Sequence, residues 1–283
     1  MSGHTTPSED NRRQLTLTPV QETLVIPLHG RAVESRKPHG LLRDEQAVRI
    51  VDSIDYDFSK FDGPSILITA LRACVFDAWT REFLTAHPGG TVVELGAGLS
   101  SRFDRLDNGS CHWFDLDLPE VIELRGRFFT DTERRRMITA SILDAEWLDE
   151  IAESPGPYLF IAEGVLPYFE ETEARKVLTT MVERFPGSLI TFDTCGSKAV
   201  AAQDRLAAIS AMRARMRWAC DTPGVLEDIG LTLHESRNLA HTQPAIRRTL
   251  PRGQQLGLRM SALLNAKDFA NYRMNLFQAG RQH

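Results

Sequence analysis

The chain has 283 residues, of which 42% are apolar and 25% charged, so it can bury one large core or two modest ones. Its formal net charge of −5 gives no general attraction to phosphate backbones or anionic lipid. The polar first 13 residues lack a secretory signal, and no stretch approaches eighteen consecutive apolar residues. We therefore expect a cytoplasmic protein that binds neither nucleic acid nor a membrane.

The sequence offers little for metal binding. Its four cysteines are widely separated and lack the short paired spacings of zinc sites: Cys74, Cys111, Cys195 and Cys220. We expect them to be reduced and buried. Histidines and carboxylates do not form a clustered pattern either, so the sequence predicts a metal-independent protein.

Two helices are expected in the first part of the chain. One spans about 44–54, where an apolar stripe is formed by Ala47, Ile50, Val51 and Ile54. A longer one starts near Pro64 and ends before Pro88. We interpret residues 1–88 as an N-terminal arm and helical cap.

From residue 89 to 283, strand-like and helix-like segments alternate, which is typical of a parallel sheet. The expected strands span 91–95, 111–116, 136–141, 158–163, 188–193, 231–236 and 272–279. The sequence therefore predicts an α/β fold: a doubly wound, Rossmann-like, mostly parallel sheet of seven strands.

An additional helix is expected between the fifth and sixth strands, within about 197–220. The segment from Lys198 to Trp218 is rich in Ala, Arg and Met, and it is longer than a simple crossover requires. Met212, Met216 and Trp218 recur at helical spacing. They either line a substrate pocket or pack in the ordinary core.

A glycine turn follows the first strand of the sheet. Glu94 lies near the end of this buried strand, and Gly96 and Gly98 follow it. In doubly wound sheets this turn is where a ligand approaches the backbone closely. A dinucleotide fingerprint would need a third glycine where Ser101 stands, which disfavours NAD. A tight turn without any ligand is the alternative.

Acidic residues end the next two strands. Asp115 and Asp117 close the second strand, where an acid can accept hydrogen bonds from both hydroxyls of a ribose. Asp117 fits equally well as the N-cap of the following helix, with Glu120 completing a capping box. Asp144, after the third strand, could accept from an adenine amino group or cap another helix.

Glu163 ends the fourth strand. A carboxylate here points into the ligand crevice, where it needs a cation unless solvent reaches it. The ammonium of S-adenosylmethionine would serve, and that cofactor needs only two glycines in the turn because it has no phosphate. The alternative is a solvated loop acid.

The order of these motifs resembles the leucine carboxyl methyltransferase family, and within it the bacterial branch that acts on polyketide carboxyl groups. The resemblance rests on 23–32, 41–44, 71–77, the glycine turn with Arg102-Phe103, 115–119 and 162–166. It implies a class I methyltransferase fold, S-adenosylmethionine as cofactor and O-methylation of a carboxylate on a small metabolite.

The resemblance also implies residue roles. In the family, the position of Arg72 pairs with the cofactor carboxylate, and the position of Glu163 meets its ammonium. Asp117 then holds the ribose, Gly96 lies under the methionine portion, and Asp144 neighbours adenine. The apolar residues that flank Arg72 on its helix also require an anion near its guanidinium.

Some positions stay open. A second basic residue of the family corresponds to either Arg36 or Lys37, and Tyr168 is a candidate contact of the acceptor. The chain departs from the family pattern at Ser100-Ser101, where an acid and a threonine are usual, and at Pro167, where a bulky apolar residue is usual.

Three classes of function remain. A carboxylate acceptor is already ionised at neutral pH and needs no general base, so none is assigned. A hydroxyl acceptor would need one, and the available histidines are His29, His112, His234 and His241. A nicotinamide-dependent oxidoreductase or a non-catalytic ligand-binding protein is the third class.

Overall fold

The computed structural model describes residues 13–14, 19–61, 64–201, 203, 214–238 and 272–280. A seven-stranded sheet dominates it, with strand order β5-β4-β3-β6-β7-β9-β8. The strands are β3 (Thr91–Leu95), β4 (His112–Asp117), β5 (Arg135–Thr139), β6 (Tyr158–Ala162), β7 (Leu189–Cys195), β8 (Leu231–Asn238) and β9 (Tyr272–Ala279). Strand β9 runs antiparallel to both β7 and β8, and the other pairs are parallel. This confirms the predicted doubly wound, mostly parallel fold of the class I methyltransferases.

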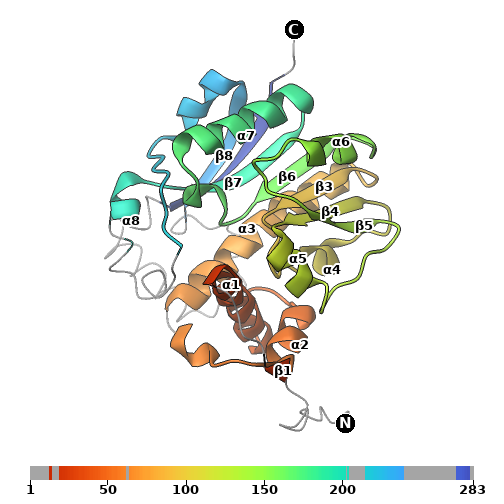
Figure 1. Ribbon diagram of the computed structural model, residues 1–283, viewed down its shortest axis with the longest axis vertical. Coiled ribbons are helices and arrows are strands. Elements are labelled where there is room, and N and C mark those ends of the chain that lie inside the picture. The colour runs from red at the N-terminus through yellow and green to blue at the C-terminus, as the bar shows by residue number, and fades with distance from the viewer. Residues whose placement is uncertain are drawn as a thin grey trace.

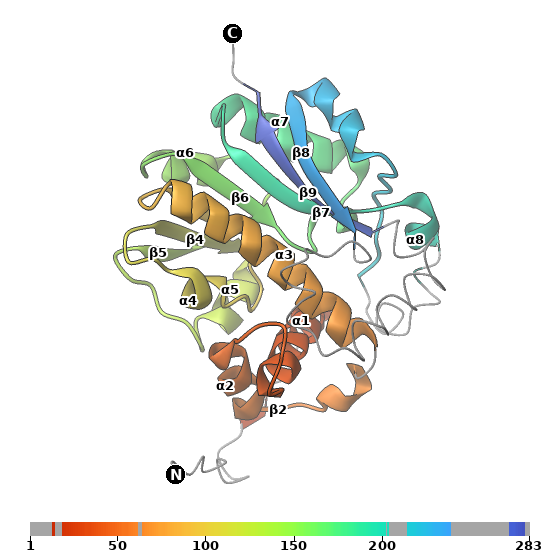
Figure 2. The same ribbon diagram turned by 180° about the vertical axis from the view of Figure 1, so that it is seen from behind.

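Helices cover both faces of the sheet (Figures 1 and 2). On one face lie α6 (Glu146–Ala152) and α7 (Glu171–Arg184), and on the other lie α3 (Pro64–Ala86) and α4 (Arg102–Leu106). The alternation along β3 explains this arrangement, because Val93 packs with α6 and α7 while Val92 packs with α3. A short helix, α5 (Pro119–Arg125), follows β4.

The helical cap lies below the sheet in Figure 1. It contains α1 (Pro19–Arg36), α2 (Glu45–Ser53) and the first part of α3, with small elements β1 (Arg13–Gln14), β2 (Ile54–Asp55) and η2 (Phe58–Phe61). The two predicted helices are confirmed, whereas α1 was not predicted. Helix α1 packs so closely on α3 that a Cβ on Gly30 would lie 2.2 Å from the Thr69 hydroxyl.

The cap meets the loops at the carboxyl ends of the strands. Arg31 Nη2 donates to the carbonyl of Leu99, after β3, at 2.7 Å, and Gln21 Nε2 donates to the carbonyl of Glu120, after β4, at 2.8 Å. Helix α3 packs on both the cap and the sheet, so the domain boundary near residue 88 stays a prediction. Among the described helices, none is long and apolar enough to span a membrane.

A helix follows the fifth strand as predicted, but it does not continue to Trp218. Helix α8 spans Ser197–Ala201, residues 202 and 204–213 lie outside the described residues, and residues 214–220 have no helical structure. The amides of Arg217 and Trp218 instead donate to the carbonyl of Pro167, at 2.8 and 3.1 Å. These tertiary hydrogen bonds and the burial of Trp218 outweigh the local helix propensity. Met212 lies outside the described residues. The next helix, η5 (Pro223–Ile229), begins after its N-cap residue Thr222.

All four cysteines are free and buried, as predicted.

Candidate active site

The glycine turn after β3 requires glycine for two reasons. Gly96 and Gly98 adopt positive φ angles of 66° and 50°. A Cβ on Gly96 would lie 2.5 Å from Val165 Cγ2, which follows β6, so the two loops approach each other closely. The amide of Gly96 donates to the carbonyl of Leu116 at 2.8 Å, which ties the turn to the end of β4. The turn is therefore fixed at the carboxyl edge of the sheet, where such folds bind ligands.

Asp117, the last residue of β4, supports this turn. Its Oδ2 accepts from the Gly98 amide at 2.7 Å, and its Oδ1 accepts from the Leu118 amide at 2.8 Å. The alternative in which Asp117 caps α5 is contradicted, because Leu118 is the N-cap and no side chain caps this helix. Burial raises the pKa of Asp117 above its usual value, and the two amide hydrogen bonds only partly offset this effect.

Arg72 and Glu163 form an ion pair at the same edge. Arg72 extends from α3, and its Nε lies 2.8 Å from Oε1 of Glu163, which follows β6. Their side chains are 16% and 14% exposed, so both charges remain partly accessible. Burial raises the pKa of Glu163, but Arg72 and Arg102 outweigh it and hold the pKa below its usual value. The carboxylate is therefore ionised at neutral pH.

Arg102, on α4, pairs with Glu163 from the interior of the protein. Its guanidinium is almost fully buried and contacts three acids: Nη2 donates to Glu163, Nη1 donates to Glu94, and Nε lies 2.7 Å from Asp77. The motif that contains Arg102 and Phe103 predicts no role for Arg102 from the sequence alone. Its partners are far apart in the chain, so no local pattern could have revealed them.

The ion pairs continue into the cap. Arg105 lies 2.9 Å from Asp77 and 2.7 Å from Asp44, and Asp44 also accepts from Arg31 at 2.8 Å. Asp44 caps α2 through the amide of Ala47. The buried charges therefore connect the N-terminus of a cap helix with the acid that follows β6.

Two further acids predicted for the site are buried in β3 and β4. Asp115 lies 2.8 Å from Arg125 and 2.7 Å from Arg135, so it is neutralised inside the protein, below the edge where Asp117 lies. Glu94 contacts Arg102, and no donor among the described residues reaches its Oε2. Burial raises the pKa of Glu94.

Asp144 lies after β5 and is exposed; its Oδ2 accepts from the Ser141 amide at 3.1 Å. It does not cap a helix either, because Ala145 is the N-cap of α6.

The possible second basic residues lie at the end of α1, on the surface of the cap. Arg36 pairs with Asp52 at 2.7 Å, and Lys37 pairs with Glu34.

The candidate acceptor residues differ in exposure. Tyr168 ends a short 3-10 helix, η3 (Leu166–Tyr168), and is half-buried. Burial raises the pKa of its hydroxyl to about 12, so the hydroxyl stays protonated and can donate. Trp218 is 3% exposed and stacks on Phe192 in the core, and Met216 is also buried. Of the two roles expected for this segment, lining a substrate pocket or packing in the core, Trp218 has the core packing.

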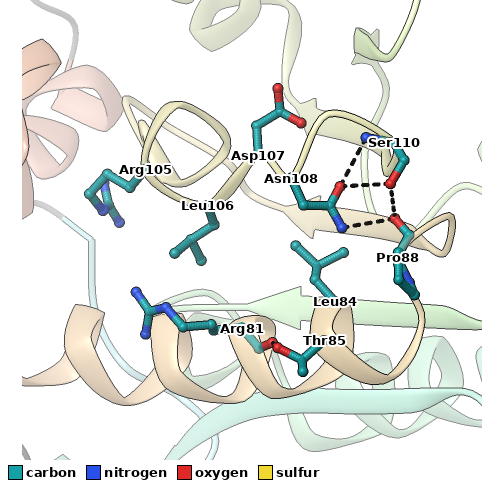
Figure 3. Close-up of a pocket in the computed structure, with 9 residues that line it drawn as sticks. All are labelled: Arg81, Leu84, Thr85, Pro88, Arg105, Leu106, Asp107, Asn108 and Ser110. Atoms are coloured by element: carbon teal, nitrogen blue, oxygen red, sulfur yellow. Dashed lines mark hydrogen bonds between the residues drawn. The ribbon is translucent and has the colours of Figure 1, made fainter.

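A surface pocket lies elsewhere (Figure 3). It has a volume of about 360 Å³, between the end of α3 and the loop that leads into β4. Its polar wall includes Asn108, whose Nδ2 donates to the carbonyl of Pro88 at 2.9 Å, and Ser110. These residues adjoin the amino ends of β3 and β4, opposite to the edge where doubly wound sheets bind ligands. We do not assign this pocket to the active site.

Comparisons with known proteins agree with this arrangement. Residues 25–182 match the family model of leucine carboxyl methyltransferase. The chain is 37% identical over 182 residues to the tetracenomycin polyketide synthesis O-methyltransferase TcmP of Streptomyces glaucescens, covering 63% of this chain and 67% of the relative. It is 31% identical over 218 residues to the S-adenosyl-L-methionine-dependent methyltransferase dpfgK of Gibberella zeae, covering 70% and 72%.

One solved structure supports the fold alone. A DUF574 family protein from Streptomyces avermitilis has a TM-score of 0.58 at 13% identity, covering 92% of this chain and 99% of that one. The sequence matches favour the two methyltransferase classes considered above over the nicotinamide-dependent class. This chain belongs to the leucine carboxyl methyltransferase family and is an S-adenosyl-L-methionine-dependent methyltransferase.

Proposed function

We propose that this enzyme methylates a carboxylate of a small polyketide-like or aromatic metabolite. The observation that carries the proposal is the Arg72–Glu163 pair beside the glycine turn, where both opposite charges are partly accessible. The amino-acid end of S-adenosylmethionine carries a carboxylate and an ammonium, which are complementary to these two side chains. The names of the family and of the relative from Streptomyces glaucescens support a carboxyl acceptor on a polyketide.

The other residues at the edge fit the same cofactor. Asp117 is ready to accept from ribose hydroxyls, since each carboxylate oxygen has a second lone pair beyond its bond to a backbone amide. Gly96 leaves the backbone open for the methionine portion. The unpaired Oε2 of Glu94 adds an acceptor beneath the turn, and Asp144 would approach the adenine. Asp115 is a weaker candidate because two arginines already neutralise it.

Bound S-adenosylmethionine supplies an electrophilic methyl group on a sulfonium. The protein's own contribution is positioning: Arg72 and Glu163 fix one end of the site, and Asp117 fixes the other. A carboxylate acceptor is ionised at neutral pH, so no residue of the chain has to remove a proton. Tyr168, whose hydroxyl stays protonated, can donate a hydrogen bond to such an acceptor.

Further proposals concern the acceptor side of the site and the cell compartment. We propose Arg36 or Lys37 as a further basic contact, and the buried segment around Met216 and Trp218 as support behind the acceptor. We also propose a cytoplasmic location without nucleic-acid or membrane partners, which the net charge of −5 supports.

The test is methyl transfer from labelled S-adenosylmethionine to a panel of aromatic and polyketide acids. We expect a labelled product that releases methanol in mild alkali, because esters hydrolyse there and aryl ethers do not. Arg72→Ala should abolish transfer, whereas Arg81→Ala, on the exposed face of the same helix, should not. A product whose methyl group survives alkali would instead make the enzyme a hydroxyl methyltransferase.

A further inference from the structure

Arg72 has partners other than Glu163. Its Nη1 donates to the hydroxyl of Tyr272 at 3.1 Å, and the same atom lies 3.6 Å from Oδ2 of Asp193. The Tyr272 hydroxyl in turn donates to Oδ2 of Asp193. A hydrogen-bonded chain therefore runs from α3 through the first residue of β9 to β7.

Asp193 also holds the loop that carries Glu163. Its Oδ1 accepts from the amide of Gly164, the residue directly after Glu163, at 2.8 Å. Gly164 has a φ of +72°, and a Cβ there would lie 3.0 Å from Nη1 of Arg72. The guanidinium of Arg72 thus lies against the Gly164 backbone, and one buried carboxylate orients both the loop and the arginine.

Asp193 is buried at 0% exposure, which is costly for a carboxylate without compensation. Burial raises its pKa, while Arg72, the Tyr272 hydroxyl and the Gly164 amide act in the opposite direction. For Arg72, burial lowers the pKa, but its contacts with Tyr272, Glu163 and Asp193 outweigh this and raise it well above the usual value. Arg72 therefore keeps an anionic neighbour even if Glu163 engages another cation.

We propose that Asp193 and Tyr272 are positioning residues that hold Arg72 and Glu163 in the relative geometry required by the amino-acid end of the cofactor. This inference rests on the proposed function of the Arg72–Glu163 pair. Because the chain acts at one end only, its loss should leave the recognition of ribose and adenine by Asp117 and its neighbours unaffected.

The experiment compares two ligands by calorimetry. S-adenosylhomocysteine has the amino-acid end, whereas 5′-methylthioadenosine keeps the adenine and ribose and lacks that end. Tyr272→Phe removes only the hydroxyl, and we expect about tenfold weaker binding of S-adenosylhomocysteine, since a hydrogen bond to a charged group is lost. Binding of 5′-methylthioadenosine should stay unchanged. Asp193→Asn should cause a larger selective loss, because it acts on Arg72 and on Gly164.

Tyr158→Phe is the matched control, because the Tyr158 hydroxyl donates to the carbonyl of Ser154 at 2.7 Å, away from the site. It should bind both ligands like the wild type. An equal loss of both ligands in Tyr272→Phe, or no loss of S-adenosylhomocysteine binding, would overturn the positioning role. Failure of the proposed role of the Arg72–Glu163 pair looks different, since Arg72→Ala itself would then bind S-adenosylhomocysteine like the wild type.

Discussion

The carboxylate of Asp117 accepts a hydrogen bond from the amide of Gly98 at 2.7 Å. This contact joins the end of β4 to the turn after β3. It places the acid proposed for the ribose directly beside the loop proposed for the methionine portion. The same contact gives Asp117 a structural role, so the effects of a substitution on cofactor affinity and on protein stability must both be measured.

We expect Asp117→Ala to weaken binding of S-adenosylhomocysteine by about 1–3 kcal/mol, because a charged, buried hydrogen-bond acceptor is lost. Stability should also fall by about 1 kcal/mol, since the Gly98 amide loses its partner. Calorimetry and urea unfolding separate the two effects. Asp131→Ala is the control, because Asp131 also accepts from a backbone amide, that of Met137 at 2.9 Å, but on an exposed loop. Unchanged affinity in Asp117→Ala would reduce Asp117 to the structural role.

Gly96→Ala should destabilise the protein and block the cofactor site. An alanine at a φ of 66° is strained by about 1–2 kcal/mol, and its Cβ would lie 2.5 Å from Val165 Cγ2. Gly109→Ala is a matched control, because Gly109 has a φ of 83° but no atom within 4 Å of the added Cβ. The difference between the two variants in unfolding free energy measures the close approach to Val165. Equal losses of stability and unchanged cofactor binding in both variants would show that the close approach of Gly96 to Val165 does not matter for function.

Much of this arrangement could be predicted from the sequence. Strands β3 and β9 match their predicted bounds to the residue, because the pattern of apolar residues in each segment is typical of a strand. Helix α1 was missed because Pro27 and Gly30 interrupt its helical pattern, and only packing on α3 explains that glycine. The charged contacts of Arg102 join residues 8, 25 and 61 positions apart, which no short motif encodes.

The ion pairs of Asp77 should make stability depend on acid pH. Arg105 and Arg102 outweigh the effect of burial and lower the pKa of Asp77 to about 2, from 3.8. A lowered pKa means that the native state favours the ionised form. Its contribution, about 2 kcal/mol, is therefore complete above pH 3.8 and is lost as the pH falls toward 2.

Asp77→Asn tests this dependence. At pH 7 the variant should be less stable than the wild type by about 3 kcal/mol, because two buried arginines lose a counterion. The difference should shrink as the pH falls from 4 toward 2 in urea unfolding experiments, since protonation of Asp77 removes the advantage of the wild type. Asp107→Asn, at an exposed ion pair with Arg134, should cause a much smaller loss at pH 7. A difference that is constant with pH would mean that Asp77 does not titrate as inferred.

The chemistry of the acceptor predicts the pH dependence of turnover. A carboxylate acceptor is ionised across the working range, so kcat should not rise with pH as it would for a phenol, whose pKa is about 10.

For the same reason, the histidines should be dispensable for turnover. His29 stacks on Phe58 within the cap, His112 lies at the amino end of β4, and His234 is exposed on the edge strand β8; His241 lies outside the described residues. We expect each of the four single alanine variants to retain most of the turnover, measured with saturating cofactor. A collapse of kcat in one variant, together with an alkali-stable product, would identify that histidine as a general base and move the acceptor to a hydroxyl group.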